Sequence, residues 1–135
     1  MTNVDVTGRA IPRLPRREIG AFVHKVLQYV KSDVREVSIA FVGDDAMTSL
    51  NRKFRRKNKT TDVLTFPGED QFLGDIVISV DQARRQAADE KHSLATEVRY
   101  LILHGILHAL GYDHETDNGE MNALELKIRA RVGLR

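Results

Sequence analysis

Residues 93–114 read SLATEVRYLILHGILHALGYDH. Ser93 is a favourable helix N-cap residue, and Gly111 accepts the positive φ that commonly ends a helix. Apolar residues stand on nearly every side of the intervening helix, a pattern typical of a helix buried at the centre of a domain. We therefore expect a central, buried helix from Ser93 to about Leu110, with the rest of the fold packed around it.

Shorter patterns predict the remaining elements. Alternating apolar and polar residues predict a strand from Glu36 to Val42, and apolar residues at helical spacing follow Pro15, which favours a helix start. The other expected elements are an edge strand at 4–6, a helix at 46–56 capped by Asp44 or Asp45, strands at 62–66 and 73–80, a helix at 81–91 capped by Asp81, and a helix at 120–132. Helices and strands are mixed without strict β-α-β alternation, so the pattern favours an α+β fold.

The composition bounds the class of protein. The chain has 135 residues, of which 41% are hydrophobic and 30% charged, the balance of a globular domain rather than a disordered tail. At about 100–200 residues per domain, we expect one domain spanning 1–135. The chain has no cysteine, which excludes a disulfide scaffold, a cysteine-ligated zinc site, an iron–sulfur cluster and a thiol nucleophile.

Two further patterns bear on location. Residues 1–18 contain no apolar stretch of the kind that a secretory signal needs. The longest run without a charged residue has 13 residues, from Tyr100 to Tyr112, and is too short to cross a bilayer. We therefore expect a cytoplasmic protein without a membrane segment.

Three histidines in the central stretch predict a metal site. His104 and His108 stand at i and i+4, so both imidazoles lie on one face of the helix, one turn apart. Gly111 lets the chain turn back after the helix, which allows His114 to supply a third nitrogen. Three neutral imidazoles suit zinc and leave a fourth position for water, whose pKa falls to about 7 in such sites.

The spacing His-x-x-x-His-x-x-Gly-x-x-His is also that of the metzincin proteases. Those enzymes carry a glutamate after the first histidine as general base, whereas Gly105 has no side chain. Neither Glu97 nor Glu115 has the required place on the helix, so the pattern disfavours peptide hydrolysis. Glycine costs a helix about 1 kcal/mol relative to alanine. Either access for a bulky substrate beside the metal or tight helix packing would explain it here.

Several other polar residues have simpler interpretations. His24 and His92 lie outside the histidine cluster and receive no function. Glu97 is expected on the surface of the central helix. Asp75 is either a capping or turn residue or a hydrogen-bond partner that orients a metal-binding histidine.

A strongly basic segment lies well ahead of the histidines. Residues 52–59 read RKFRRKNK, with six basic residues in eight. The segment carries +6 and the whole chain +2, which leaves −4 for the remaining residues. Such a concentration of charge is typical of a phosphate-binding surface, although cations also favour a helix C-terminus and a solvated helix end stays open as an alternative. An arginine beside a metal-activated hydroxide would make phosphodiester hydrolysis more natural than amide hydrolysis.

In three blocks the sequence resembles the YbeY family of bacterial endoribonucleases, also called rRNA maturation factors. The matching blocks are 104–114 against H-G-x-L-H-L-x-G-Y-D-H, 55–67 against an arginine, a basic stretch and T-D-V-L-[ST]-F-P, and 74–76 against G-D-I. Ala109 replaces the usual leucine, and Arg56 and Thr60 replace a common glycine and proline. None of these departures removes a predicted metal ligand, but two of them lie in the loop that presents Arg55.

The resemblance implies a small mixed sheet packed against helices. It also implies one zinc ion per chain, held by His104, His108 and His114, and a catalytic Arg55 in a positively charged cleft next to the metal. The neighbouring cations are candidate RNA-binding residues: Arg52, Lys53, Arg56, Lys57 and Lys59.

The activity that the resemblance implies is single-strand-specific RNA cleavage, in maturation of the 3′ end of 16S rRNA and in ribosome quality control. The implied partners are the small ribosomal subunit and its assembly factors. Either a metal-activated hydroxide attacks phosphorus or the adjacent 2′-OH does so, while Arg55 and the metal share the developing negative charge. The sequence does not choose between these two nucleophiles.

Two alternatives to this enzyme stay open. The chain could be a non-catalytic RNA-binding ribosome assembly factor whose metal is structural, with the cut made by another nuclease. It could also be a metallohydrolase acting on peptides or small esters, against which Gly105 counts.

Overall fold

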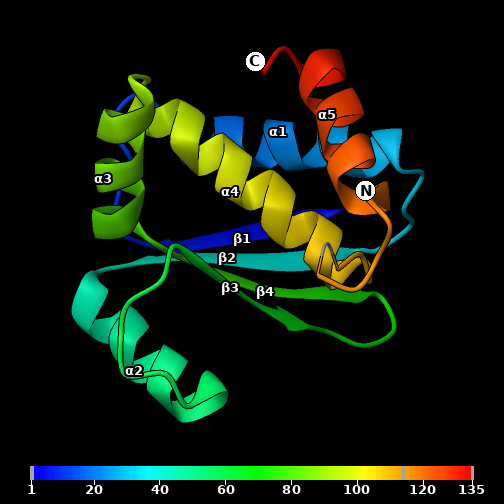
Figure 1. Ribbon diagram of the computed structural model, residues 1–135. Coiled ribbons are helices and arrows are strands. Elements are labelled where there is room, and N and C mark those ends of the chain that lie inside the picture. Colours follow the sequence, from blue (N-terminus) through cyan, green and yellow to red (C-terminus); the bar gives the residue numbers. More distant parts are fainter. Residues whose placement is uncertain (1, 114, 135) are drawn as a thin grey trace.

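The chain folds into a four-stranded sheet with helices on both faces (Figure 1). The structure is a computed structural model and describes residues 2–113 and 115–134. The elements, in chain order, are β1 (Asn3–Gly8), α1 (Arg16–Tyr29), β2 (Glu36–Val42), α2 (Asp44–Arg55), β3 (Val63–Pro67), β4 (Phe72–Ser79), α3 (Val80–Glu90), α4 (Leu94–Ala109) and α5 (Glu120–Val132).

The sheet is mixed, and its strand order is β1-β2-β4-β3. Strands β1, β2 and β4 run parallel, whereas β3 pairs antiparallel with β4 through the short connection between them. β3 therefore forms one edge of the sheet, with only β4 as a partner among the described strands. This single-domain arrangement confirms the α+β class and the small mixed sheet.

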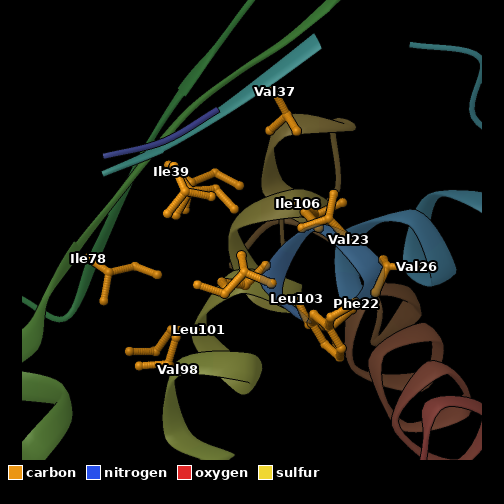
Figure 2. Packing of buried hydrophobic residues seen from close by; sticks show 14 of the residues in the cluster. Phe22, Val23, Val26, Val37, Ile39, Ile78, Val98, Leu101, Leu103 and Ile106 are labelled. Atoms are coloured by element: carbon orange, nitrogen blue, oxygen red, sulfur yellow. The ribbon is translucent and has the colours of Figure 1, made fainter. Parts of the chain in front are cut away.

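Alternation along the strands separates two apolar layers. Val37, Ile39 and Ile78 point to one face of the sheet, where they pack with α1 and α4 in the main core (Figure 2). On the opposite face, Val77 packs with Leu64 and with Met47 of α2 in a smaller cluster. α2 thus lies alone among the described helices on its side of the sheet, as Figure 1 shows.

α4 is the central helix that the sequence predicts. It crosses the sheet between α3 and α5 (Figure 1). Its buried side chains are Ala95, Glu97, Val98, Leu101, Ile102, Leu103, Ile106 and Leu107, together with Gly105. The apolar coat is not complete, because Tyr100, His104 and His108 are half-buried. These three residues, four apart, form a stripe along the helix that has partial access to solvent.

Gly105 is explained by packing. A Cβ at this position would lie 2.8 Å from Cγ2 of Ile76 on β4, closer than real Cβ contacts allow. The glycine therefore lets α4 approach the sheet closely. Of the two explanations that the sequence left open, the structure supports tight helix packing.

Glu97 is not a surface charge, contrary to the prediction. The residue is 7% exposed, and its Oε2 accepts a hydrogen bond of 2.9 Å from the Gln86 side chain of α3. Its Oε1 lies 2.7 Å from Nε2 of His92. A buried carboxylate needs such partners, and His92 thus has a structural role between α3 and α4.

Two predicted helix caps are also wrong. The N-cap residue of α2 is Gly43, so Asp44 and Asp45 lie in the first turn of the helix rather than at its cap. α3 is capped by Ser79, whose hydroxyl accepts a hydrogen bond from the Gln82 backbone N–H at 3.2 Å. Asp81 does not cap α3, and its Oδ1 accepts a hydrogen bond from the Arg9 side chain instead. Within the described ranges no helix is long and apolar enough to cross a membrane.

Candidate active site

A cleft of about 560 Å³ lies where α2, β3 and α4 meet. Its walls are Phe54 and Arg55 at the end of α2, residues 61–67 through β3, His104 and His108 of α4, and Asp113 and Glu115 beyond that helix. Two of the three blocks that resemble family motifs contribute residues to the cleft, namely 55–67 and the described part of 104–114. The third block, 74–76, is not among the described lining residues. The cleft is the candidate active site.

The two histidine rings lie together on the cleft side of α4. Their centroids are 4.7 Å apart and the ring planes are inclined at 73°. The i, i+4 spacing brings the two rings next to each other on one face of the helix. The His104 side chain is 31% exposed, because it lies on the half-buried stripe of α4. Both rings are therefore accessible to a small ion in the cleft.

Glu125 of α5 is the outer partner of the histidine pair. Its Oε1 lies 3.3 Å from Nδ1 of His104, and its side chain is 22% exposed. A carboxylate on one ring nitrogen orients a histidine so that the other nitrogen faces a metal. The alternative candidate, Asp75, is wrong for this role: it is exposed, and it alternates with Ile76, whose side chain contacts α4.

The third predicted ligand, His114, lies outside the described residues. Within 2–113 and 115–134, no group of three or more histidine or carboxylate side chains gathers in a way that would hold a metal. The donor chemistry of the described pair nevertheless fits zinc, since two neighbouring imidazoles and a carboxylate behind one of them are features of zinc sites.

Arg55 lines the cleft from the other side of the sheet edge, opposite the histidine helix. It is the last residue of α2, it is exposed, and it lines the same cleft as His104 and His108. The other predicted RNA-binding residues are also exposed, but they are not among the described residues that line the cleft: Arg52, Lys53, Arg56, Lys57 and Lys59.

The charge of the cleft differs from what the resemblance implies. The charged side chains among its described lining residues are Arg55, Asp62, Asp113 and Glu115. The excess of positive charge lies beside the cleft, on the segment 52–59, rather than inside it. A phosphate chain would therefore meet the basic segment first and Arg55 at the cleft itself.

The loop after α2 is held by residues that sequence reasoning missed. Arg56 closes α2 in the left-handed conformation, with φ 57°, which explains why glycine suits this position. The buried Asn51 side chain donates a hydrogen bond of 2.9 Å to the Lys59 carbonyl. The Thr60 hydroxyl donates to Oδ1 of Asp44 at 3.0 Å. These contacts fix the segment that joins Arg55 to β3.

Asp44 links this loop to the rest of the fold. Arg85 of α3 contacts both of its carboxylate oxygens, at 2.9 and 3.0 Å, and the Ser79 hydroxyl donates at 3.0 Å. The hydrogen bond from Arg85, with those from Thr60 and Ser79, holds the pKa of Asp44 below its usual value, against the opposing effect of burial. The backbone N–H of Asp44 and the Arg9 side chain likewise lower the pKa of Asp81.

Comparison with known proteins places the chain in a family. A sequence model described as Endoribonuclease YbeY matches residues 9–133. A relative named Endoribonuclease YbeY from Solibacter usitatus is 42% identical over 129 residues, which cover 96% of this chain and 88% of the relative. Another with the same name, from Koribacter versatilis, is 50% identical over 100 residues, covering 73% and 66% of the two chains.

The fold comparison agrees with these sequence matches. The solution structure of TM1509 from Thermotoga maritima has a TM-score of 0.70 and 25% sequence identity, covering 97% of this chain and 90% of that one. The fold, the order of the motifs and a sequence match over nearly the whole length lead to one assignment: the chain belongs to the YbeY endoribonuclease family.

Proposed function

We propose that the protein is a zinc-dependent, single-strand-specific endoribonuclease. One observation carries the proposal: Arg55 lines the same cleft as His104 and His108, although these residues belong to elements on different faces of the sheet. A phosphate-binding cation next to a pair of metal-binding imidazoles suits hydrolysis of a phosphodiester. The names of the relatives, Endoribonuclease YbeY, support the same activity.

One zinc ion per chain would be held by His104, His108 and His114. When bound, zinc acts as a Lewis acid that activates water and neutralises negative charge near neutral pH. Glu125 accepts a hydrogen bond from Nδ1 of His104 and so keeps Nε2 as the metal-binding nitrogen. The close packing of Gly105 on Ile76 fixes the part of α4 between the first two ligands.

Arg55 binds the scissile phosphate. Its guanidinium offers planar paired donors to two phosphoryl oxygens, and these hydrogen bonds strengthen as negative charge develops on those oxygens in the transition state. The exposed cations of 52–59 bind neighbouring phosphates and guide the strand toward the cleft. The acidic side chains in the cleft, including Asp62, repel phosphates that lie away from Arg55.

The site favours RNA over peptide as substrate. A protease of this histidine spacing needs a glutamate where this chain has Gly105. Even a Cβ there would lie within 2.8 Å of Ile76, so the packing of α4 leaves no room for such a base. The peptidase alternative thus lacks both the residue and the space.

The biological setting of the proposal follows the family resemblance. The substrate is the single-stranded 3′ precursor of 16S rRNA, and the partners are the small ribosomal subunit and its assembly factors. The same cleavage would act in ribosome quality control. We place the protein in the cytoplasm, where these particles assemble.

The proposal is tested by cleavage of an end-labelled 16S rRNA 3′ precursor. The natural chain, His108→Ala and His24→Ala are purified in parallel and compared, since His24 contacts the Thr2 carbonyl away from the cleft. We expect His24→Ala to cut like the natural chain and a folded His108→Ala to be inactive. Equal cutting by all three would show a contaminating nuclease and overturn the proposal. RNA binding without cutting would favour the assembly-factor alternative.

The ends of the product distinguish the two nucleophiles. Attack by water leaves a simple monophosphate, whereas attack by the adjacent 2′-OH leaves a cyclic phosphate. A substrate with 2′-deoxyribose only at the cut position is the matched control. It should still be cut in the first case and be resistant in the second.

A further inference from the structure

We propose that Phe54 is a stacking platform for a nucleobase of the RNA strand, next to the phosphate that Arg55 binds. The inference rests on the proposed function and goes further, because it names the part of the substrate that a second cleft residue contacts. It also supplies a physical reason for a preference for single strands.

Phe54 is unusually exposed for a phenylalanine. Its exposed fraction is 54%. Among the other large apolar residues that the structure describes, only Leu126 and Tyr29 are also exposed. It follows the buried residues Met47 and Asn51 along one side of α2, at the seven- and three-residue spacings of a helix face. Because α2 ends at the next residue, Phe54 extends this face past the small apolar cluster and into the wall of the cleft.

Two neighbours hold the ring in position, one aromatic and one cationic. Phe66 of β3, which is half-buried, meets Phe54 edge-on, with ring centroids 5.0 Å apart and planes at 69°. The ammonium of the exposed Lys53 lies over the Phe54 ring, 5.3 Å from its centroid, and an incoming base would displace this flexible side chain. An edge-to-face neighbour restrains an aromatic ring while leaving much of its surface open, which is the arrangement that a stacking platform requires.

The surroundings identify the occupant as a base of a nucleic acid strand. Phe54 lies between cations on both sides in the sequence, Lys53 and Arg55, within the segment of highest positive charge. A single strand alternates phosphates with bases, so a phosphate on Arg55 places a base within reach of the adjacent ring. Aromatic platforms flanked by cations bind single strands with little sequence preference, since every base has a π-face.

The same contact disfavours a duplex. In double-stranded RNA the bases are stacked on one another and paired, so none can lie on Phe54 without being unstacked. Single strands offer their bases at lower cost. Stacking on Phe54 would therefore favour single-stranded RNA at the cleft itself, whereas the charges of 52–59 attract both forms.

The chain offers a direct spectroscopic test, because it contains no tryptophan. Phe54→Trp introduces a single indole at the platform, in a His108→Ala background that leaves the RNA uncut. Leu126→Trp in the same background is the matched control, because Leu126 is 52% exposed on α5 and is not among the described residues of the cleft. We expect short single-stranded RNA to quench the fluorescence at position 54 and not at 126, and an abasic strand to quench less.

Binding by the otherwise natural chain gives a second readout. Phe54→Leu should weaken binding of single-stranded RNA by roughly 5- to 150-fold, the range for loss of one stacked base. Phe54→Tyr should bind almost as well as the natural chain. The salt dependence of binding should be the same for all three, because the number of contacted phosphates is unchanged.

Two contrary results would have different meanings. Natural affinity in Phe54→Leu, together with unquenched fluorescence at position 54 in a Phe54→Trp/His108→Ala chain that binds the RNA, would overturn the platform. Cutting of the same RNA by the natural chain would then leave the proposed function intact. A natural chain that neither binds nor cuts single-stranded RNA would overturn both. Urea unfolding of Phe54→Leu shows that any loss of affinity is not a loss of fold.

Discussion

His104 and His108 are accessible because of where they stand on α4. The other faces of the helix pack against the sheet and neighbouring helices, and the stripe with these two residues borders the cleft. Burial of unpartnered imidazoles would be costly, so the open stripe and the contact between His104 and Glu125 keep the pair polar without destabilising the core.

Arg55 and Arg52 should differ in which kinetic constant they affect. Arg55→Ala is expected to lower turnover of single-stranded RNA by roughly 100- to 1,000-fold, as for loss of one donor to a transition state. Arg52→Ala, one turn earlier on α2 and outside the described lining of the cleft, should weaken binding and its salt dependence instead. Single-turnover cleavage and filter binding at several salt concentrations measure both. The opposite pattern would assign Arg55 to binding alone.

Glu125 should act as a positioning residue for zinc. Glu125→Gln keeps the shape of the side chain but removes the negative charge behind Nδ1 of His104, so zinc affinity is expected to fall by about 10- to 100-fold. Competition with a chelator of known affinity measures this directly. Glu90→Gln, exposed at the end of α3, is the control and should bind zinc normally. Unchanged affinity in Glu125→Gln would exclude the positioning role.

At the scale of elements, the approach of α4 to β4 places the histidine helix. Ile76 is fully buried, and its branched side chain fills the space beside Gly105. The helix can lie this close to the sheet only at a residue without a Cβ. The position of both histidines relative to β3 therefore depends on one glycine in the middle of the helix.

Gly105→Ala should destabilise the protein despite the better helix propensity of alanine. Overpacking a core typically costs 1–3 kcal/mol, whereas replacing glycine by alanine stabilises a helix by about 1 kcal/mol. We therefore expect the free energy of unfolding to fall by about 1 kcal/mol. Urea unfolding measures the change. In Gly105→Ala/Ile76→Ala the clash is absent, so the double variant should be more stable than the sum of the two single effects implies. Strict additivity would show that the two residues do not compete for space.

At the scale of the whole molecule, Asp44 joins elements that are distant in sequence. Its carboxylate contacts Thr60 of the loop, Ser79 of β4 and Arg85 of α3, while its own backbone belongs to α2. The loop that follows Arg55 is thereby tied to the last residue of β4 and to α3. Ionisation of Asp44 is part of this connection, because each partner donates to the charged form.

Because of Asp44, the free energy of unfolding should decrease as the pH becomes acidic. The pKa of Asp44 is lowered in the folded protein, so its stabilising contribution is present above the unfolded pKa of about 3.9 and is lost as pH falls through the folded pKa. We expect Asp44→Asn to be less stable than the natural chain at neutral pH and the difference to shrink below about pH 4. Urea unfolding across this range checks the sign. A constant difference would show that the carboxylate contributes nothing through its charge.

Metal removal should abolish activity without unfolding the chain. The main core consists of apolar side chains from α1, α4 and the sheet, and the described histidines lie at its margin. A chelator is therefore expected to stop RNA cleavage while circular dichroism stays native, and added zinc should restore cleavage. Unfolding on metal removal would instead support the structural-metal alternative, since metal binding would then drive folding.

The sequence by itself determined the elements and the local chemistry. The apolar coat of α4, the i, i+4 histidines and the alternation in β2 are periodic patterns, and backbone geometry converts such patterns directly into helices and strands. The three motif blocks, read together, were sufficient for the family, which the comparisons confirm. Zinc, His114 as a ligand and the catalytic role of Arg55 stay predictions.

Only the tertiary structure decided which residues meet. Glu125 rather than Asp75 stands behind His104, Glu97 is buried with His92, and Gly105 serves packing. No local sequence pattern predicts these contacts, because they join side chains of separate elements. Which of these side chains meet depends on strand register and on how closely each helix packs on the sheet. The meeting of Arg55 with the histidine pair is of the same kind: the sequence supplied the residues, and the packing of α2 and α4 around the edge strand β3 brought them to one cleft.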